Sequence, residues 1–251
     1  MTLYFEEHGC SEGPLIVFLH GGGVSGWMWD QQLSYFRDYQ CIVPDLPEHG
    51  RSKGEDHFSI LSSAEKVIEL IRDKGKGKQV VLIGFSLGAQ ITIQILSMRP
   101  ELIDHAVINS ALAKPMPHGW KFLKPFIKIS HPLIKWRPFS KLQAKVLYIQ
   151  EDDFEKYYKE NCAMEQGTLI RILEENMSFK APSEFKLASS NILVTVGENE
   201  NSLMKKSAKE IVNSNPNCHG VLVSGVGHGF PLAKPELFSK MVKDWIEGNA
   251  I

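Results

Sequence analysis

The sequence predicts an α/β fold: a doubly wound, mostly parallel sheet flanked by helices, with an inserted, mostly helical segment. Short runs of apolar residues recur along the chain without polar alternation, which is typical of strands buried on both faces. Helical stretches separate these runs, and strands that alternate with helices form parallel sheets. One run ends abruptly in the turn 84–88 (Gly-Phe-Ser-Leu-Gly), directly before a helical stretch, and this turn is the most informative feature of the chain.

The elements follow one another with little between them. We expect a first strand near residues 3–7 and six buried strands at residues 15–19, 41–44, 80–83, 105–109, 192–196 and 221–223. Apolar residues at helical spacing, together with the connecting lengths, predict helices that start near Trp29 and at residues 59–74, 90–98, around Ala208, and 235–248.

The alternation of strands and helices stops between Asn109 and Ile192. A gap of about eighty residues is too long for a plain loop in a compact domain. Residues 148–177 have a helical pattern, so we expect a mostly α-helical insertion that caps the sheet. The predicted division is therefore a core domain of residues 1–110 and 188–251 and a cap of residues 111–187.

The charges of this insertion are segregated. Its first half has eight cations and no acid, namely Lys114, Lys121, Lys124, Lys128, Lys135, Arg137, Lys141 and Lys145, whereas residues 151–153 open an acidic part. The same half holds the aromatic residues Trp120, Phe122, Phe126, Trp136 and Phe139, and five prolines that we expect to break it into short pieces. Solvated lysines, buried aromatic rings and attraction between the two halves are the favoured interpretation. The alternative is a surface that meets lipid or another acidic partner.

Composition excludes several classes of protein. The chain has 251 residues, 43% of them hydrophobic, and its 28 basic and 29 acidic residues give a net charge of −1, so no global field attracts nucleic acid. The longest apolar runs are too short to span a bilayer, and the N-terminus does not resemble a secretory signal. Cys10, Cys41, Cys162 and Cys218 show no CxxC pairing, which favours a reducing compartment over disulfides or zinc. We expect a cytoplasmic monomer or small homo-oligomer without metal or cofactor.

Ser86 is the candidate nucleophile. It stands between a strand and a helix, so that its Oγ projects beyond the end of the sheet. Gly84 and Gly88 fit such a turn because a Cβ at either position would collide with a neighbouring strand or helix. An ordinary glycine-rich turn is the alternative.

A glycine-rich loop follows the strand at residues 15–19. Acyl transfer through a tetrahedral intermediate needs two N–H donors aimed at the developing oxyanion. The N–H of Leu87, directly after the nucleophile, is one candidate, and an N–H of the loop Gly21–Gly23 is the other, with Gly22 preferred. We expect His20, just before this loop, to orient the loop rather than to take a proton.

His228 is the candidate base, since it lies in the loop after the last strand, at the edge of the sheet where Ser86 also lies. The base needs an acid that fixes its tautomer and stabilises the imidazolium. Glu198 and Glu200 both follow the strand at 192–196, and position alone does not choose between them. His49 falls in a segment, residues 45–52, that is better interpreted as a structured turn.

Together these motifs resemble the α/β-hydrolase superfamily, in its capped, esterase-like branch, over essentially the whole chain. The matching segments are HGGG at 20–23, DLPEHGRS at 45–52, GFSLG at 84–88, GENE at 197–200 and GVGHGFPLAKPELF at 225–238. The resemblance implies Ser86 as nucleophile, His228 as base, and Gly22 and Leu87 as oxyanion donors. It favours Glu200 over Glu198 as the acid, although the family more often has Asp there. Glu48 also stands where Gly is usual.

The function expected from this resemblance is that of a cofactor-free serine hydrolase. It would cleave a carboxylic ester or a related small-molecule acyl substrate through an acyl-enzyme on Ser86. Thioesterase, lyase or carbon–carbon hydrolase chemistry with the same triad stays open. So does a ligand sensor that hydrolyses slowly and signals through its cap. We expect no nucleic-acid partner and no stable membrane insertion.

Overall fold

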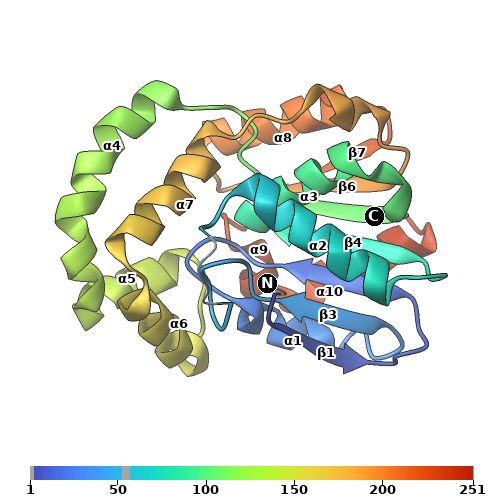
Figure 1. Cartoon of the computed structure of the whole chain (residues 1–251), viewed down its shortest axis with the longest axis horizontal. Coiled ribbons are helices and arrows are strands. Elements are labelled where there is room, and N and C mark those ends of the chain that lie inside the picture. The colour runs from blue at the N-terminus through green and yellow to red at the C-terminus, as the bar shows by residue number, and fades with distance from the viewer. Residues whose placement is uncertain (1–2, 53–56, 251) are drawn as a thin grey trace.

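The computed structural model describes residues 3–52 and 57–250, apart from the side chains of residues 117–123. Seven strands form one sheet in the order β1-β3-β2-β4-β5-β6-β7 (Figure 1). Their bounds are β1 Phe5–Gly9, β2 Leu15–Leu19, β3 Gln40–Pro44, β4 Val80–Phe85, β5 His105–Asn109, β6 Asn191–Gly197 and β7 Cys218–Val223. Only β1 runs antiparallel to its neighbour, so the predicted mostly parallel sheet is confirmed.

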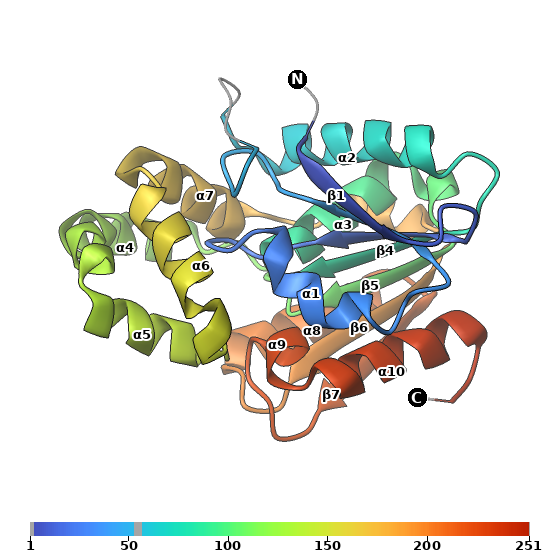
Figure 2. The same ribbon diagram turned by 90° about the horizontal axis from the view of Figure 1, so that it is seen from below.

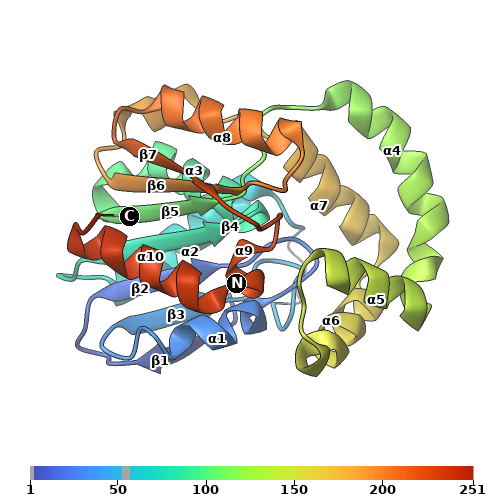
Figure 3. The same ribbon diagram turned by 180° about the vertical axis from the view of Figure 1, so that it is seen from behind.

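Helices cover both faces of the sheet. One apolar cluster joins the sheet to α2 (Ile60–Lys74), α3 (Leu87–Met98) and α8 (Ser202–Ser214). A second cluster joins the opposite face to the 3-10 helix η1 (Gly26–Trp29), α9 (Phe230–Ala233) and α10 (Pro235–Glu247). Helix α1 (Asp30–Leu33) accompanies α10, and Figures 2 and 3 show the two on the side of the sheet away from α2. Short 3-10 turns, η2 (Pro100–Leu102) and η4 (Ser183–Leu187), complete the core.

Helix α2 illustrates why these helices form where the sequence predicts them. Ser59 has extended backbone angles, and its hydroxyl accepts a hydrogen bond from the N–H of Ser62, which caps the first turn. The side chains that recur at helical spacing, from Ile60 to Ile71, are buried against the sheet. The helix ends at Lys74, directly before Gly75. Burial of this apolar face, rather than helix propensity, holds the helix in place.

Between β5 and β6 the chain forms a separate helical insertion. It consists of α4 (Pro117–Ser130), η3 (His131–Lys135), α5 (Arg137–Val146), α6 (Glu151–Ala163) and α7 (Gln166–Ser178). Figure 1 shows these helices at one end of the sheet. Among the described residues, no helix has both the length and the apolar character needed to cross a membrane.

Some expectations for this insertion hold and others fail. Its basic and acidic halves do attract each other, through Lys124–Glu174 (3.7 Å), Lys141–Glu151 (2.9 Å) and Arg137–Glu155. The prolines break the segment less than expected, because Pro125 lies inside α4 and others occupy the first turns of helices, where no N–H is missed.

The aromatic side chains of the insertion are less buried than expected. Phe126 and Trp136 are 71% and 60% exposed, so the prediction of buried rings is wrong for these two. A single layer of helices packs only its inner side against the rest of the protein, which leaves apolar residues of the outer side in solvent. The side chains of Trp120 and Phe122 lie outside the described part.

The insertion leaves and re-enters the core through a narrow neck. The N–H of Met116 donates to the carbonyl of Met177 at 2.8 Å, which joins the two passing segments. Gln90 of α3, fully buried, donates its side-chain amide to the carbonyls of Leu112 (2.7 Å) and Asn176 (2.9 Å). The side chain of Gln90 therefore contacts both the segment that leaves the core and the segment that returns to it.

Away from the neck, Glu48 attaches the core to α7. It has a positive φ of 62°, in the region that the usual glycine adopts freely. Its carboxylate accepts hydrogen bonds from Arg171 (2.5 and 3.1 Å), from Thr168 (3.1 Å) and from the N–H of Phe58 (2.7 Å). Burial alone would raise the pKa of Glu48, but these donors lower it to about 2, so the carboxylate stays ionised. The departure from glycine at this position therefore creates a contact between core and insertion.

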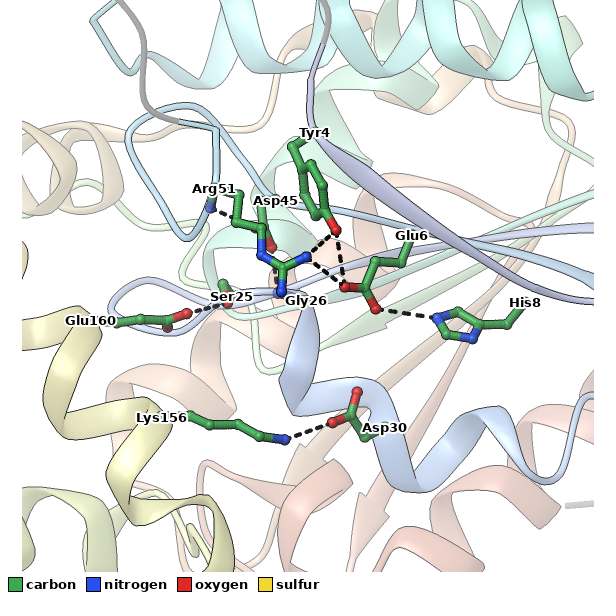
Figure 4. A network of polar contacts seen from close by, with 10 residues as sticks. All are labelled: Tyr4, Glu6, His8, Ser25, Gly26, Asp30, Asp45, Arg51, Lys156 and Glu160. Carbon is green, nitrogen blue, oxygen red and sulfur yellow. Dashed lines mark hydrogen bonds and ion pairs between the residues drawn. The ribbon is translucent and has the colours of Figure 1, made fainter.

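Helix α6 makes a further attachment, on the side of β3 and β1 (Figure 4). The carboxylate of Glu160 accepts from the hydroxyl of Ser25 (2.6 Å) and from the indole N–H of Trp27 (2.9 Å). One turn earlier, Lys156 pairs with Asp30 at 2.9 Å. These contacts of α7, of α6 and of the neck hold the insertion to the core.

Replacing Arg171 with Gln should lower the free energy of unfolding by about 1–3 kcal/mol, because it leaves the half-enclosed Glu48 carboxylate without its main donor. Arg137→Gln is the matched control. Its partner Glu155 and Arg137 itself are both about half exposed, and exposed ion pairs of this kind contribute little to stability. Urea denaturation of both variants measures the difference. Equal effects would show that the Glu48 contact contributes no more than a surface pair.

Candidate active site

The turn after β4 places Ser86 in a strained conformation at the carboxyl end of the sheet. Its backbone angles are φ 53° and ψ −108°, outside the regions that non-glycine residues usually occupy. A Cβ at Gly84 would lie 2.4 Å from the carbonyl oxygen of Gly88, and a Cβ at Gly88 would lie 2.3 Å from that of Leu19. The close approach of α3 to β2 and β4 therefore requires both glycines, and it leaves Ser86 as the residue that makes the turn.

The structure brings the predicted base to this serine. His228 lies in the loop between β7 and α9, with its Nε2 2.9 Å from Ser86 Oγ and its Nδ1 2.8 Å from Glu200 Oε2. An ionised carboxylate only accepts hydrogen bonds, so Nδ1 carries the proton and Nε2 is free to accept the serine hydroxyl proton. The ring of Phe85 lies 5.1 Å from the imidazole, centroid to centroid, and supports it from one side.

Glu200 is held firmly behind the imidazole. Its second oxygen accepts hydrogen bonds from the hydroxyl of Ser110 (2.6 Å) and from the N–H of Gly197 (3.0 Å). Burial would raise the pKa of Glu200, but the hydrogen bond and charge of His228, with these two donors, keep it below its ordinary value. A buried, fully hydrogen-bonded carboxylate is suited to fixing the tautomer and orientation of a histidine.

Glu198, the other acid that the sequence leaves open, has different partners. Its carboxylate accepts from the N–H of Gly225 (2.9 Å) and from the hydroxyl of Ser224 (2.8 Å), in the exposed turn after β7. These two hydrogen bonds lower the pKa of Glu198. It stabilises the loop that carries His228, whereas Glu200 contacts the imidazole itself.

Both candidate oxyanion donors border the same cavity as Ser86. Leu87 is the first residue of α3, where the N–H has no acceptor within the helix. Gly22 lies opposite, close enough that a Cβ on it would be 3.7 Å from the Leu87 side chain. Two N–H groups, one from the start of a helix and one from a glycine loop, can thus approach one oxygen atom bound at Ser86.

The glycine loop is fixed from both sides. His20 is completely buried, its Nδ1 donates to the carbonyl of Gly21 (2.8 Å), and its Nε2 accepts from the N–H of Leu46 (2.9 Å). Burial lowers the pKa of His20 to about 4, so it is neutral and orients the loop, as the sequence indicates. From the insertion, Asn161 donates its side-chain amide to the carbonyl of Gly23 at 2.9 Å.

The segment 45–52 forms the structured turn that the sequence predicts. Asp45 accepts from the N–H groups of Gly26 and Arg51, both at 2.8 Å (Figure 4). His49 is buried beside His20, and its Nδ1 donates to the carbonyl of Pro47. Burial lowers the pKa of His49 to about 3, and it takes no part in the Ser86 cluster.

Sequence reasoning missed two residues of the site, Ser110 and Tyr148. Both have positive φ angles, 56° and 60°. Ser110 directly follows β5, at the sheet edge where Ser86 lies, so its position was a usable signal. Tyr148, between α5 and α6, accepts a hydrogen bond from the N–H of Gly227 beside His228 (3.0 Å), and no local pattern marks it.

Two cavities meet at Ser86. One, of about 310 Å³, lies on the side of Gly22 and Leu87 and has mainly apolar walls from α4 to α7, among them Ile127, Ile134, Phe139, Leu169 and Leu173. The other, of about 580 Å³, lies on the side of His228 and is more polar and more open, with Lys145, Tyr148, Asn176, Asn199 and Asn201 in its wall. Within the described part of the chain, no three His, Cys, Asp or Glu side chains cluster as metal ligands.

Several proteins resemble this chain over nearly its whole length. "Putative carbamate hydrolase RutD" of Stutzerimonas stutzeri is 24% identical over 259 residues, which cover 96% of each chain. The pimeloyl-[acyl-carrier protein] methyl ester esterase of Yersinia pseudotuberculosis is 22% identical, again with 96% of each chain covered.

Solved structures have the same fold. The bromoperoxidase of Bacillus anthracis superimposes with a TM-score of 0.82 at 18% identity, covering 98% of this chain and 95% of its own. MenH of S. aureus gives a TM-score of 0.78 at 18% identity, with 99% of both chains covered.

The family is defined by a match that extends over most of the chain. A model described as the alpha/beta hydrolase family matches residues 16–241, from β2 to the last helix. This range includes the turn at Ser86, the loop of His228 and the whole insertion. The chain belongs to the alpha/beta hydrolase family.

Proposed function

We propose that this hydrolase cleaves a carboxylic ester, or a related small-molecule acyl compound, through an acyl-enzyme on Ser86. The observation that carries the proposal is the continuous chain of contacts from Ser86 Oγ to His228 (2.9 Å) and on to Glu200 (2.8 Å). One relative is named a carbamate hydrolase and another a methyl ester esterase, and these names support a substrate of ester type.

In the first half-reaction, Ser86 Oγ attacks the carbonyl carbon of the substrate while His228 Nε2 takes the hydroxyl proton. The carbonyl π electrons move to oxygen, and the N–H groups of Leu87 and Gly22 donate to the resulting oxyanion. When the tetrahedral intermediate collapses, the bond to the leaving alcohol breaks. The alcohol then receives the proton from Nε2, and the acyl group stays on Ser86.

The second half-reaction repeats these steps with water. His228 removes a proton from a water molecule, whose oxygen attacks the acyl carbon, and the proton then returns to Ser86 as the carboxylic acid leaves. Glu200 stays ionised throughout and stabilises the imidazolium that forms in each half-reaction. The hydrogen bonds from Ser110 and Gly197 favour this charged state.

The two cavities support an assignment of the two parts of the substrate. The oxyanion donors border the apolar cavity, so the acyl group occupies the space enclosed by α4 to α7. His228, which protonates the leaving group, borders the larger and more polar of the two cavities, so the alcohol leaves on that side. In this proposal the helical insertion is a cap that selects the acyl chain.

Ser86→Ala should reduce turnover of a simple aryl ester by about 10³–10⁶-fold, because the covalent route disappears while the oxyanion donors remain. A fluorophosphonate probe should label wild type at Ser86 alone, as found by peptide mass spectrometry. Ser97→Ala, at a serine of α3 outside the site, is the control and should keep the label. Activity that survives in Ser86→Ala would exclude the serine mechanism, and labelling without repeated turnover would favour the ligand-sensing alternative.

Glu200→Gln should cost far more activity than Glu198→Gln. The amide can donate an N–H to Nδ1 and so favours the wrong tautomer of His228, a change that costs about 10⁴-fold in a serine protease. Glu198 contacts only the turn that carries His228, and its variant should lose less than about tenfold. The comparison uses kcat for one ester under identical conditions. Similar losses in the two variants would remove Glu200 from the proposed mechanism.

The apolar cavity predicts a dependence on acyl chain length. Each added methylene that enters it should raise kcat/KM roughly fourfold, the equivalent of about 0.8 kcal/mol, until the cavity is full. Phe139→Trp should shift the optimum of a p-nitrophenyl ester series to shorter chains, since Phe139 lines the cavity. Phe126→Trp, on the exposed side of α4, is the control and should leave the optimum in place. An unchanged optimum in Phe139→Trp would place the acyl group elsewhere.

A further inference from the structure

The outer side of the insertion exposes an unusual number of large apolar side chains. Five of the eleven such side chains in the described part of the chain lie between residues 126 and 142, namely Phe126, Ile129, Leu133, Trp136 and Leu142. Phe126 and Ile129 are the most exposed of the eleven, at 71% and 77%. We name this stretch of α4, η3 and α5 the outer strip. Exposed apolar side chains gathered on one part of a protein mark an interaction site more often than scattered ones do.

The charge of the outer strip has one sign. No acidic residue occurs between residues 114 and 145. Lys124, Arg137 and Lys141 pair with acids of α6 and α7, so part of the positive charge is neutralised. Lys128 and Lys135 are exposed and have no ion-pair partner among the residues that the structure describes. Unpaired cations therefore alternate with apolar side chains along the strip.

We propose that the outer strip docks onto the surface of an anionic phospholipid bilayer. Lysine ammonium groups would lie at the lipid phosphates and carboxylates, while the aliphatic side chains and the amphipathic ring of Trp136 would enter the boundary between headgroups and acyl chains. A second copy of this chain is a poorer partner, because two such strips would bring like charges together. The docking is peripheral, which agrees with the absence of a membrane-spanning helix among the described residues.

The same helices that carry the outer strip also form part of the wall of the apolar cavity at Ser86. Ile127, Ile134 and Phe139 alternate with the residues of the outer strip and line the apolar cavity at Ser86. The wall between the bilayer surface and this cavity would then be a single layer of helix. An acyl compound dissolved in the membrane would have a short path to the cavity. The docking itself does not depend on the reaction proposed at Ser86.

The test is sedimentation of the whole protein with vesicles of phosphatidylcholine, with and without phosphatidylserine. Wild type should bind the phosphatidylserine vesicles more tightly, and binding should weaken from about 0.1 M to about 1 M salt, as the Debye length falls from roughly 10 to 3 Å. The double variant Lys128→Gln/Lys135→Gln should bind roughly 25-fold more weakly, at about fivefold for each lysine. Phe126→Ser/Trp136→Ser should lose at least about tenfold.

The control is Leu61→Ser/Leu187→Ser. These leucines are 52% and 67% exposed, on α2 and η4, outside the outer strip. This variant should bind vesicles like wild type, and so should Ser86→Ala, which separates docking from catalysis. Equal loss in the leucine control, or no preference for phosphatidylserine, would overturn the proposal. So would a dimer in light scattering that the strip variants convert to monomer, since a second copy would then be the partner.

Discussion

The close packing of α3 against β2 and β4 is the constraint on which the rest of the molecule depends. The helix begins so near the sheet that Gly84 and Gly88 have no room for a Cβ, and the chain turns at Ser86 with a positive φ. This conformation is strained for a non-glycine residue, and the packing around Ser86 must stabilise it. The same helix begins at Leu87, which borders the cavity, and it carries Gln90, which donates to both segments of the neck. The proposed nucleophile, the proposed oxyanion donor and the insertion are thus all positioned by one helix.

The sheet and much of the candidate site could be predicted from the sequence because their signals are local. Continuous apolar runs identify buried strands, and in a parallel sheet the loops after these strands meet at one edge. This is why residues as far apart as Ser86 and His228 could be placed together. The choice between Glu198 and Glu200 could not be made in the same way. Glu198 and Glu200 belong to the same turn and differ in the direction in which their side chains point. Hydrogen bonds from Ser110, from Ser224 and from the turn itself decide these directions.

The contacts between the insertion and the core could not be predicted, since each joins residues that are far apart in the sequence and follow no periodic pattern. Glu48 and Arg171 are 123 positions apart, and Asn161 and Gly23 are 138 apart. Tyr148 reaches the loop of His228 across 79 positions. The exposure of Phe126 has a different origin. Apolar character predicts burial only where a second layer of structure exists to cover the residue, and the insertion has one layer.

The neck between Met116 and Met177 makes the insertion a side branch of the fold. Because the chain leaves and returns through one hydrogen-bonded point, residues can be added to or removed from the branch without shifting the register of β5 and β6. The proposed catalytic residues at the sheet edge and the proposed substrate-selecting surface of the insertion can therefore change independently during evolution. Among relatives, the residues in the loops at the sheet edge would then be conserved, whereas the residues in the helices of the insertion would vary.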